Sequence, residues 1–349
     1  MPQRPRLTPP MADVRRAVRS GLEEAGLSSG DLVLVACSGG ADSLALAAAA
    51  VFVGAQASDA LGLRVGAVIV EHGLQEVTAK VAEETAARLR ELGLDPVEVV
   101  AVTVDGQSGA VTGGTEAAAR DVRYAALAAS ARRLGAKAIL LGHTLNDQAE
   151  TVLLGLARGS GLKSVAGMRA VTPESGFVYL RPLLVLTRAD TEAFCRDSGL
   201  SYWTDPHNSD SKFARVRVRT EALPALEAAI GPGVAEALTR TAELVRDDLD
   251  YLEAQAEKAY GDLVKLGPTG ITISAAAIGA LPNALASRIV HRAIGVFGAN
   301  PTKAHVDQVL QLVRNWHGQK ELALPSVRVF RQGHDLTLKS SKTLRPGAC

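Results

Sequence analysis

The sequence from Asp31 to Val53 reads DLVLVACSGGADSLALAAAAVFV. The short apolar run up to Ala36 is typical of a buried strand, and the run from Asp42 onward is typical of a helix. The turn between them is Ser38-Gly39-Gly40, and glycines let backbone N–H groups approach an anion closely. This order predicts the first unit of an α/β fold, with an anion site at the turn.

The same order of elements repeats along the chain. The other expected strands are 65–70, 97–104, 138–141 and 177–180, and the expected helices are 78–92, 115–134, one from about 146, and 188–197. Continuously apolar strands that alternate with helices are typical of a parallel sheet covered on both faces. The predicted fold class is therefore α/β, with a doubly wound parallel sheet that binds its ligand at the carboxyl ends of the strands.

The pattern changes after about residue 215. Residues 1–27 are expected to form an N-terminal arm and helix, and residues 28–215 the nucleotide-binding α/β domain. Residues 216–349 are expected to form a smaller, helix-rich substrate domain that ends in a hairpin and a basic tail.

Composition narrows the class of protein. Hydrophobic residues make up 47% of the 349 residues and charged residues 21%, as in soluble globular proteins. Every apolar stretch is shorter than the roughly 18 residues that span a bilayer, so no membrane role is expected. The cysteines Cys37, Cys195 and Cys349 are far apart and form no CxxC pair, which favours a reducing cytoplasm. The oligomeric state is left open, with a homodimer as one alternative.

The glycine turn is the first candidate site. Ser38 and Ser43 add hydroxyl donors to the backbone N–H groups that would bind phosphate. Asp42 would repel phosphate, so its carboxylate calls for a Mg²⁺ ion or a cationic substrate beside it. The alternative is a strand-to-helix turn that Ser and Asp merely cap.

The second candidate site is GHTLNDQAET, residues 142–151, which follows another expected strand. His143, Asp147 and Glu150 are spaced i, i+4, i+7 and would share one helical face. Such a set could hold Mg²⁺, orient an amine or move a proton. The alternative is a capped helix whose acidic residues complement its dipole.

Two further groups of residues are basic. Arg120 and Arg123 lie one helical turn apart and could grip a phosphate or a carboxylate. Lys212, Arg215, Arg217 and Arg219 form the densest basic run in the chain, which suggests contact with a nucleic-acid backbone. The alternative for Arg120 and Arg123 is a solvated helix face on which Glu116 pairs with Arg120, and the alternative for the run is a solvated group of charges at a domain junction. The overall net charge of +1 does not choose between these readings.

Taken together, these motifs resemble a known family. SGGADS is similar to the pyrophosphate loop, or PP-loop, of the N-type ATP pyrophosphatases, which cleave ATP to AMP and pyrophosphate. GHTLNDQAETVLLGLARGSGLKSVAGM, EAAARDVRY, RPLL and DPHNSD resemble tRNA(Ile)-lysidine synthetases in particular, in the same order. The resemblance covers about residues 30 to 225 and implies a fold like that of the adenine nucleotide alpha hydrolases.

The resemblance implies an activity. ATP would adenylate C2 of the wobble cytidine in an isoleucine tRNA with a CAU anticodon. The ε-amine of L-lysine would then displace AMP and give lysidine. The implied substrates are ATP, L-lysine and this tRNA, with Mg²⁺ as the metal.

The resemblance also implies residue roles. Asp42 would bind the metal, and Glu71 and His72 would line the nucleotide pocket. The implied ATP-binding residues are Ser38, Gly39, Gly40, Ala41, Asp42, Ser43, Glu71, His72 and Gly142. The implied catalytic residues are Asp42, Arg123, His143, Asp147 and Glu150. The implied tRNA-binding residues are Lys212, Arg215, Arg217 and Arg219. One departure bears on the site, because Asn146 stands where the family usually has Asp.

Three other functions fit part of the sequence. A tRNA thiolase of the same superfamily needs reactive or cluster-binding cysteines, which the spacing of the three cysteines does not offer. A small-molecule amidating enzyme would not need the basic run at Lys212 to Arg219. A non-catalytic nucleotide-binding module would keep the glycine turn but would not need His143, Asp147 and Glu150 on one face.

Overall fold

The computed structural model describes residues 7–71, 76–103, 114–159, 161–204, 210–268 and 270–341. His72, Cys349 and residues 205–209 of the DPHNSD motif therefore lie outside the described residues. The chain divides into two compact units, Met1–Glu243 and Leu244–Cys349. The expected boundary at 215/216 falls inside the first unit, because Val218, Leu223 and Val234 share a buried apolar cluster with Ala149.

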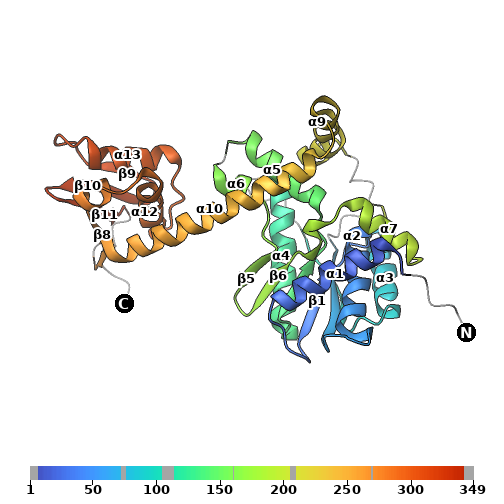
Figure 1. Cartoon of the computed structure of the whole chain (residues 1–349). Coiled ribbons are helices and arrows are strands. Elements are labelled where there is room, and N and C mark those ends of the chain that lie inside the picture. Colours follow the sequence, from blue (N-terminus) through green and yellow to red (C-terminus); the bar gives the residue numbers. More distant parts are fainter. Residues whose placement is uncertain are drawn as a thin grey trace, which may run out of the picture. The chain divides into compact units, whose positions relative to one another are not determined.

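A six-stranded sheet organises the first unit, with the strand order β3-β2-β1-β4-β6-β5. Figure 1 labels β1, β5 and β6 of this sheet. The strands are β1 (Leu32–Ala36), β2 (Arg64–Glu71), β3 (Val97–Ala101), β4 (Ala138–Leu141), β5 (Val171–Glu174) and β6 (Phe177–Leu180). All neighbours pair in parallel except β5, which is antiparallel to β6. The predicted parallel α/β sheet is confirmed. Strand β5 was not predicted, because it is a short edge strand that contains Pro173.

Helices cover both faces of this sheet. Val33 and Val35 of β1 pack into one apolar cluster, whereas Leu32 and Leu34 pack into another. This alternation shows that the sheet is buried on both faces, as the continuous apolar strands predict. The helices of this unit are α1 (Pro9–Glu24), α2 (Ala41–Val51), α3 (Glu76–Glu91), α4 (Gly114–Leu134), α5 (Leu145–Ala157), α6 (Leu162–Val165), α7 (Arg188–Asp197), α8 (Ala214–Arg217) and α9 (Leu223–Ile230). Shorter turns are η1 (Phe52–Gln56), η2 (Pro182–Val185) and η4 (Val218–Ala222).

The strand order places the site. The chain leaves β1 towards β2 and β3, then returns to β4 on the other side of β1, which makes the β1/β4 junction a topological switch point. Ala36 pairs with Leu141, so the segments that follow these two residues emerge side by side. Gly142 allows this close approach, because a Cβ there would lie 3.2 Å from the backbone of Asp42 and Ser43 and would push against the start of α2.

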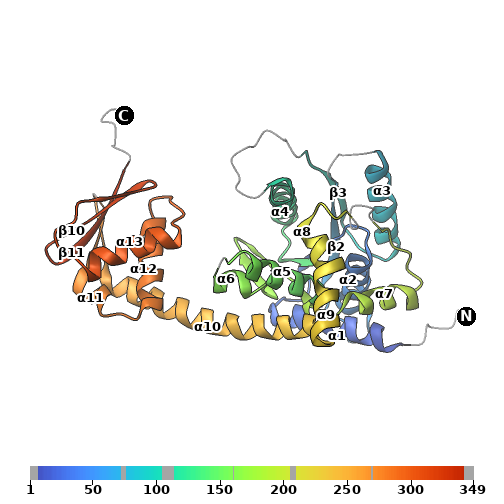
Figure 2. The same cartoon turned by 90° about the horizontal axis from the view of Figure 1, so that it is seen from above.

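The second unit contains a five-stranded sheet with the order β7-β8-β11-β10-β9, and all its pairs are antiparallel. Its strands are β7 (Val264–Gly267), β8 (Gly270–Ser274), β9 (Leu322–Leu324), β10 (Val327–Gln332) and β11 (Asp335–Ser340). Its helices are α11 (Ala275–Gly279), α12 (Asn283–Gly295) and α13 (Lys303–Arg314), and α10 (Val234–Leu263) leads into it (Figure 2). The expected helices and terminal hairpin are present. The prediction of a helix-rich domain did not include the five-stranded sheet.

The core of this sheet follows the period of two of its strands. Ile271, Ile273, Leu336 and Leu338 are all almost fully buried and alternate with more exposed neighbours. Among the described residues, no helix has the length and apolarity that crossing a bilayer requires.

Candidate active site

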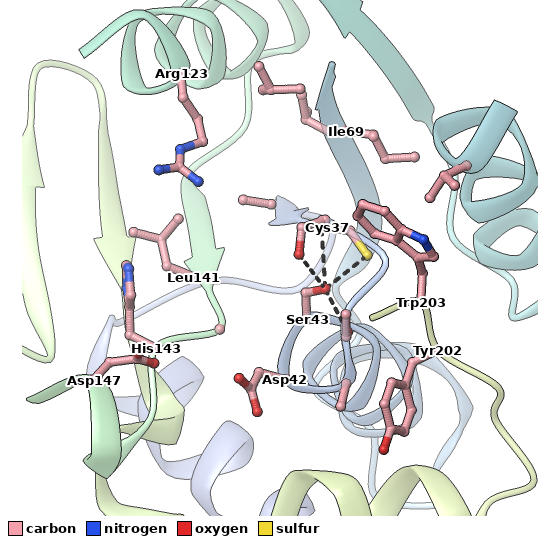
Figure 3. A pocket seen from close by; sticks show the side chains of 18 of the residues that line it. Cys37, Asp42, Ser43, Ile69, Arg123, Leu141, His143, Asp147, Tyr202 and Trp203 are labelled. Carbon is pink, nitrogen blue, oxygen red and sulfur yellow. Dashed lines mark hydrogen bonds between the residues drawn. The ribbon is translucent and has the colours of Figure 1, made fainter. Parts of the chain in front are cut away.

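A cavity of about 720 Å³ lies at the carboxyl ends of β1, β2 and β4 (Figure 3). The residues that line it come from segments widely separated in the sequence. The predicted site residues among them are Ser38, Gly40, Ala41, Asp42, Ser43, Glu71, Arg123, Gly142, His143, Asp147, Arg215 and Arg219. The predicted residues Gly39, Glu150, Lys212 and Arg217 do not line it.

The glycine turn is held by its own side chains. Ser43 Oγ donates to the carbonyl of Gly40 at 2.9 Å and accepts from the backbone N–H of Ser38 at 3.2 Å. Gly39 has a φ of 83°, and a Cβ there would come within 2.8 Å of Thr85 Oγ1 on α3. Gly39 is therefore a turn residue packed against α3, and Gly40 and Ala41 present the helix start to the cavity.

Two carboxylates face the cavity, bridged by one guanidinium. Arg188 Nε lies 3.4 Å from Asp42 Oδ2, and Arg188 Nη2 lies 3.2 Å from Asp147 Oδ1. Burial raises the pKa of Asp42 above its usual value, although Thr191 and Arg188 oppose the rise. Burial also acts against ionisation of Asp147, but Arg188 and the backbone N–H of Thr144 bring the pKa of this carboxyl below its usual value.

Asp147 serves as both a helix cap and a site residue. Its Oδ2 accepts from the backbone N–H of Thr144 at 2.9 Å and from Thr144 Oγ1 at 3.1 Å, which completes a capping box at the start of α5. Its Oδ1 is the atom that faces Arg188. The capped-helix alternative is therefore correct for Oδ2 of Asp147, whereas Oδ1 faces the cavity.

His143 is a neutral imidazole in this setting. Burial lowers its pKa to about 3, against the opposing charge of Asp147, and Arg181, Arg120 and Arg215 add to the lowering. Within the described part of the chain, its buried Nδ1 has no hydrogen-bond partner. A buried polar atom without a partner calls for a ligand or water, and this side chain lines the cavity.

The low pKa of His143 predicts a pH effect on stability. In the unfolded chain His143 takes up a proton near pH 6.5, and in the folded chain only near pH 3. Acid therefore favours the unfolded state, and this contribution to stability is lost as pH falls from 6.5 towards 3. We expect His143 to account for about 1 kcal/mol of the loss in unfolding free energy between pH 6 and pH 5. Urea unfolding of the wild type and His143→Asn at both pH values measures it, and an equal pH dependence would contradict it.

Glu150 is fully buried and lies behind the cavity. Arg219 Nε lies 2.7 Å from Glu150 Oε1, and Arg215 Nε lies 3.4 Å from Glu150 Oε2. Glu150 therefore holds two guanidiniums that line the cavity. It does not itself reach the cavity.

The basic run divides by helical face. Arg215 and Arg219 turn inward, whereas Lys212 and Arg217 are exposed. Arg217 Nη1 donates to the carbonyls of Ser211 at 2.6 Å and Lys212 at 2.9 Å. Of the four residues predicted to bind tRNA, Lys212 and Arg217 are therefore exposed, whereas Arg215 and Arg219 line the cavity.

Three further residues were not predicted to belong to the site. Arg188 and Thr191 come from α7, and a hydrogen bond from Thr191 Oγ1 to Asp42 Oδ1 joins that helix to the glycine turn. Trp203 donates its backbone N–H to the carbonyl of Gly39 at 3.0 Å, and its indole lines the cavity. Figure 3 shows Trp203, Cys37 and Ile69 on one side of Ser43, with His143 and Asp147 on the other.

Arg123 points into the cavity from α4 (Figure 3). Its neighbour Arg120 instead stacks on Tyr124, with the guanidinium 4.8 Å from the ring centroid. Both arginines therefore line the cavity, Arg123 pointing into it and Arg120 held against Tyr124.

Comparison with known proteins identifies the class first. The family model of the PP-loop domain matches residues 12–226, and that of the TilS substrate binding domain matches residues 273–336. The fold and the glycine turn thus belong to an ATP-using PP-loop enzyme. A U34-tRNA thiolase from Methanococcus maripaludis shares this fold, with a TM-score of 0.54 and 19% identity over 68% of this chain and 79% of that chain.

Sequence relatives define the family within that class. The tRNA(Ile)-lysidine synthase of Thermobifida fusca is 49% identical over 94% of this chain and 96% of its own length. That of Streptomyces coelicolor is 50% identical over 90% of this chain and 87% of its own length. The chain belongs to the tRNA(Ile)-lysidine synthase family.

Proposed function

We propose that the protein ligates L-lysine to C2 of the wobble cytidine of an isoleucine tRNA with a CAU anticodon. ATP supplies the activation, AMP and pyrophosphate leave, and the product is lysidine. The observation that carries this proposal is the pair Asp42 and Asp147, whose carboxylates face the same cavity as the anion-binding turn. Carboxylates beside a phosphate site suit a substrate that bears an ammonium group. A cytoplasmic location follows from this tRNA substrate.

We infer places in the cavity for the phosphates and for the adenine ring of ATP. The glycine turn and the start of α2 offer N–H groups to the phosphates. The apolar side formed by Cys37, Ile69, Ala82 and Trp203 suits the adenine ring. Arg123, on the opposite wall, supplies positive charge to a phosphate or to the lysine carboxylate.

Mg²⁺ fits this site as an ion carried on the phosphates. Among the described residues, no cluster of three His, Cys, Asp or Glu side chains forms a protein-only metal site. Mg²⁺ commonly takes one or two carboxylates together with substrate phosphates, and Asp42 is placed to be such a ligand. When bound, the ion would neutralise phosphate charge.

The remaining groups handle the nucleophile. Asp147 Oδ1 is placed to bind the ε-ammonium of lysine in exchange for the guanidinium of Arg188. His143, a neutral imidazole that lines the cavity, could accept a hydrogen bond from the amine or from the base. In the covalent step a bond forms between lysine Nζ and C2 of the cytosine. The bond between C2 and the oxygen that carries the adenylate breaks, AMP leaves with that oxygen, and the amine releases a proton.

Incorporation of labelled lysine into this tRNA tests the proposal. We expect incorporation that requires both ATP and Mg²⁺. Pyrophosphate release without incorporation would favour the amidating alternative, and ATP binding without turnover would favour the nucleotide-binding module. Sulfur transfer is disfavoured because Cys37 and Cys195 are buried and burial raises the pKa of both thiols.

Trp203 gives the adenine placement its own test. The chain has two tryptophans, so Trp316→Phe leaves Trp203 as the sole indole. We expect ATP to quench the emission of this variant, because the base stacks on the indole. We also expect Trp203→Leu to raise the KM for ATP about tenfold, since base–aromatic stacking contributes roughly 1–3 kcal/mol. Unchanged emission at saturating ATP would place adenine elsewhere.

The exposed pair of the basic run gives a test of tRNA contact. We expect Lys212→Ala combined with Arg217→Ala to weaken tRNA binding and to lower the slope of log K against log salt by about 1.5. Lys80→Ala with Arg16→Ala, a matched pair of exposed residues on α3 and α1, serves as the control. Equal salt slopes in the two double variants would remove Lys212 and Arg217 from the RNA surface.

A further inference from the structure

The start of α7 is anchored to the first turn of α5. The backbone N–H of Arg188, the first residue of α7, donates to Asn146 Oδ1 at 2.9 Å. The role of Asn146 in this contact is to accept a hydrogen bond. An oxygen of Asp at this position could accept the same bond. Arg188 is thereby fixed at its backbone, beside the two carboxylates that its side chain contacts.

Thr191 lies one turn later on the same helix and is fully buried. Its Oγ1 is within hydrogen-bond distance of both Asp42 Oδ1 and the carbonyl oxygen of Arg188, the latter at 2.8 Å. A hydroxyl has one proton to donate, and we assign it to the carboxylate because charge-assisted hydrogen bonds are the stronger kind.

Each oxygen of Asp42 is therefore held from α7. Oδ1 accepts from Thr191, and Oδ2 faces Arg188 Nε at 3.4 Å. Without these contacts the side chain of Asp42 could change rotamer at the helix start, away from a phosphate that repels it. With them, its carboxylate stays between the glycine turn and Asp147.

We propose that Thr191 and Arg188 are positioning residues that hold the Asp42 carboxylate in its reactive orientation. This inference rests on the proposed function. Catalysis is sensitive to displacements of a reacting group by an ångström or less, so a carboxylate free to rotate would lose rate rather than substrate affinity.

The contact is not needed to build α7 itself. Thr187 and Asp190 already cap this helix, with Thr187 Oγ1 donating to Asp190 Oδ2 at 2.6 Å. The carbonyl of Arg188, 2.8 Å from Thr191 Oγ1, offers the hydroxyl a local acceptor of the kind that buried helical threonines often use. Because the hydroxyl proton is assigned to Asp42 instead, that bond serves the site and not the helix.

The test compares three single variants in the full chain. Thr191→Val removes the hydroxyl at nearly constant volume, and Thr191→Ser keeps it. Thr239→Val is the matched control, because Thr239 is also buried in a helix but donates to the carbonyl of Ala235 at 3.0 Å and contacts no carboxylate in the described structure. Thermal unfolding of each variant without ligands reports whether the fold is intact.

We expect Thr191→Val to lower kcat for lysine incorporation by about 10- to 100-fold, the loss that corresponds to one hydrogen bond to a charged group. The KM for tRNA is expected to change by less than about twofold, and Thr191→Ser is expected to restore most of the rate. Thr239→Val is expected to keep the wild-type kcat.

Two outcomes would overturn the inference. One is a wild-type kcat for Thr191→Val, and the other is an equal loss in Thr191→Val and Thr191→Ser. Failure of the proposed function would look different, because the wild type itself would then incorporate no lysine.

Discussion

Asp42→Asn is expected to lower lysidine formation at least about 1000-fold while leaving the folded structure intact. The amide has the shape of the carboxylate but no charge, so it cannot offset an ammonium or bind Mg²⁺. The carboxylate also belongs to the group in which Arg188 bridges Asp42 and Asp147. Groups that act as a unit lose nearly all activity when one is removed.

The same variant is expected to be at least as stable as the wild type. Burial raises the pKa of Asp42 in the folded chain, so the ionised carboxylate costs stability at neutral pH. The sign follows from linkage: a raised acid pKa gives stability that is present below the unfolded pKa and is lost as pH rises through the folded pKa. Asp42→Asn has no carboxylate to ionise, so its free energy of unfolding does not fall as pH rises through the pKa of Asp42.

Thermal unfolding at pH 7 and labelled-lysine incorporation measure the two halves of this prediction. Asp59→Asn is the control, because Asp59 is exposed and pairs with Arg19 away from the cavity. Retained activity in Asp42→Asn would remove Asp42 from the reaction. A lower unfolding temperature together with lost activity would make its role structural.

The fold could be predicted wherever strands are apolar and central. Strands β1, β2 and β4 are buried on both faces, and their continuous apolar runs show in the sequence. Strands β5, β7 and β9 lie at the edges of the two sheets, and they are short. Their stability comes from neighbours far along the chain, which a local pattern does not contain.

The site residues that could be predicted are those that directly follow parallel strands. Asp42 and His143 follow β1 and β4, so the sheet itself brings them to one edge. Arg188 and Thr191 reach the same place from a helix whose position no local motif reports. Their one sequence signal was the start of a capped helix soon after RPLL.

The basic run shows what a count of charges leaves out. Arg215 and Arg219 are spaced i, i+4 and share a face, whereas Arg217 lies on another. Helical spacing therefore separates the inward pair from the outward residue, although it does not say which face is buried. The buried face is the one that carries Arg215 and Arg219, because both pair with Glu150, whose carboxylate has no exposed surface.

Arg219→Met is expected to be strongly destabilising, because it leaves the buried carboxylate of Glu150 with Arg215 alone. Arg219 supplies the two shorter contacts to Glu150, at 2.7 Å and 3.2 Å, and Arg215 lies at 3.4 Å. Breaking a buried ion pair by removing one partner costs about 3–5 kcal/mol, and the remaining arginine places this case near 3 kcal/mol. For a unit of this size the unfolding temperature should fall by about 6–12 °C.

A double variant separates the ion pair from simple loss of packing. Glu150→Leu added to Arg219→Met removes the orphaned charge as well, and buried pairs replaced by apolar residues often regain stability. We expect the double variant to unfold at a higher temperature than Arg219→Met. Arg217→Met is the matched control, since this exposed arginine contacts only backbone carbonyls among the described residues, and it should shift the midpoint by less than about 3 °C. If Arg219→Met and Arg217→Met shifted the midpoint equally, or if the double variant were the least stable, the Glu150 pair would not be what holds Arg219 at the cavity wall.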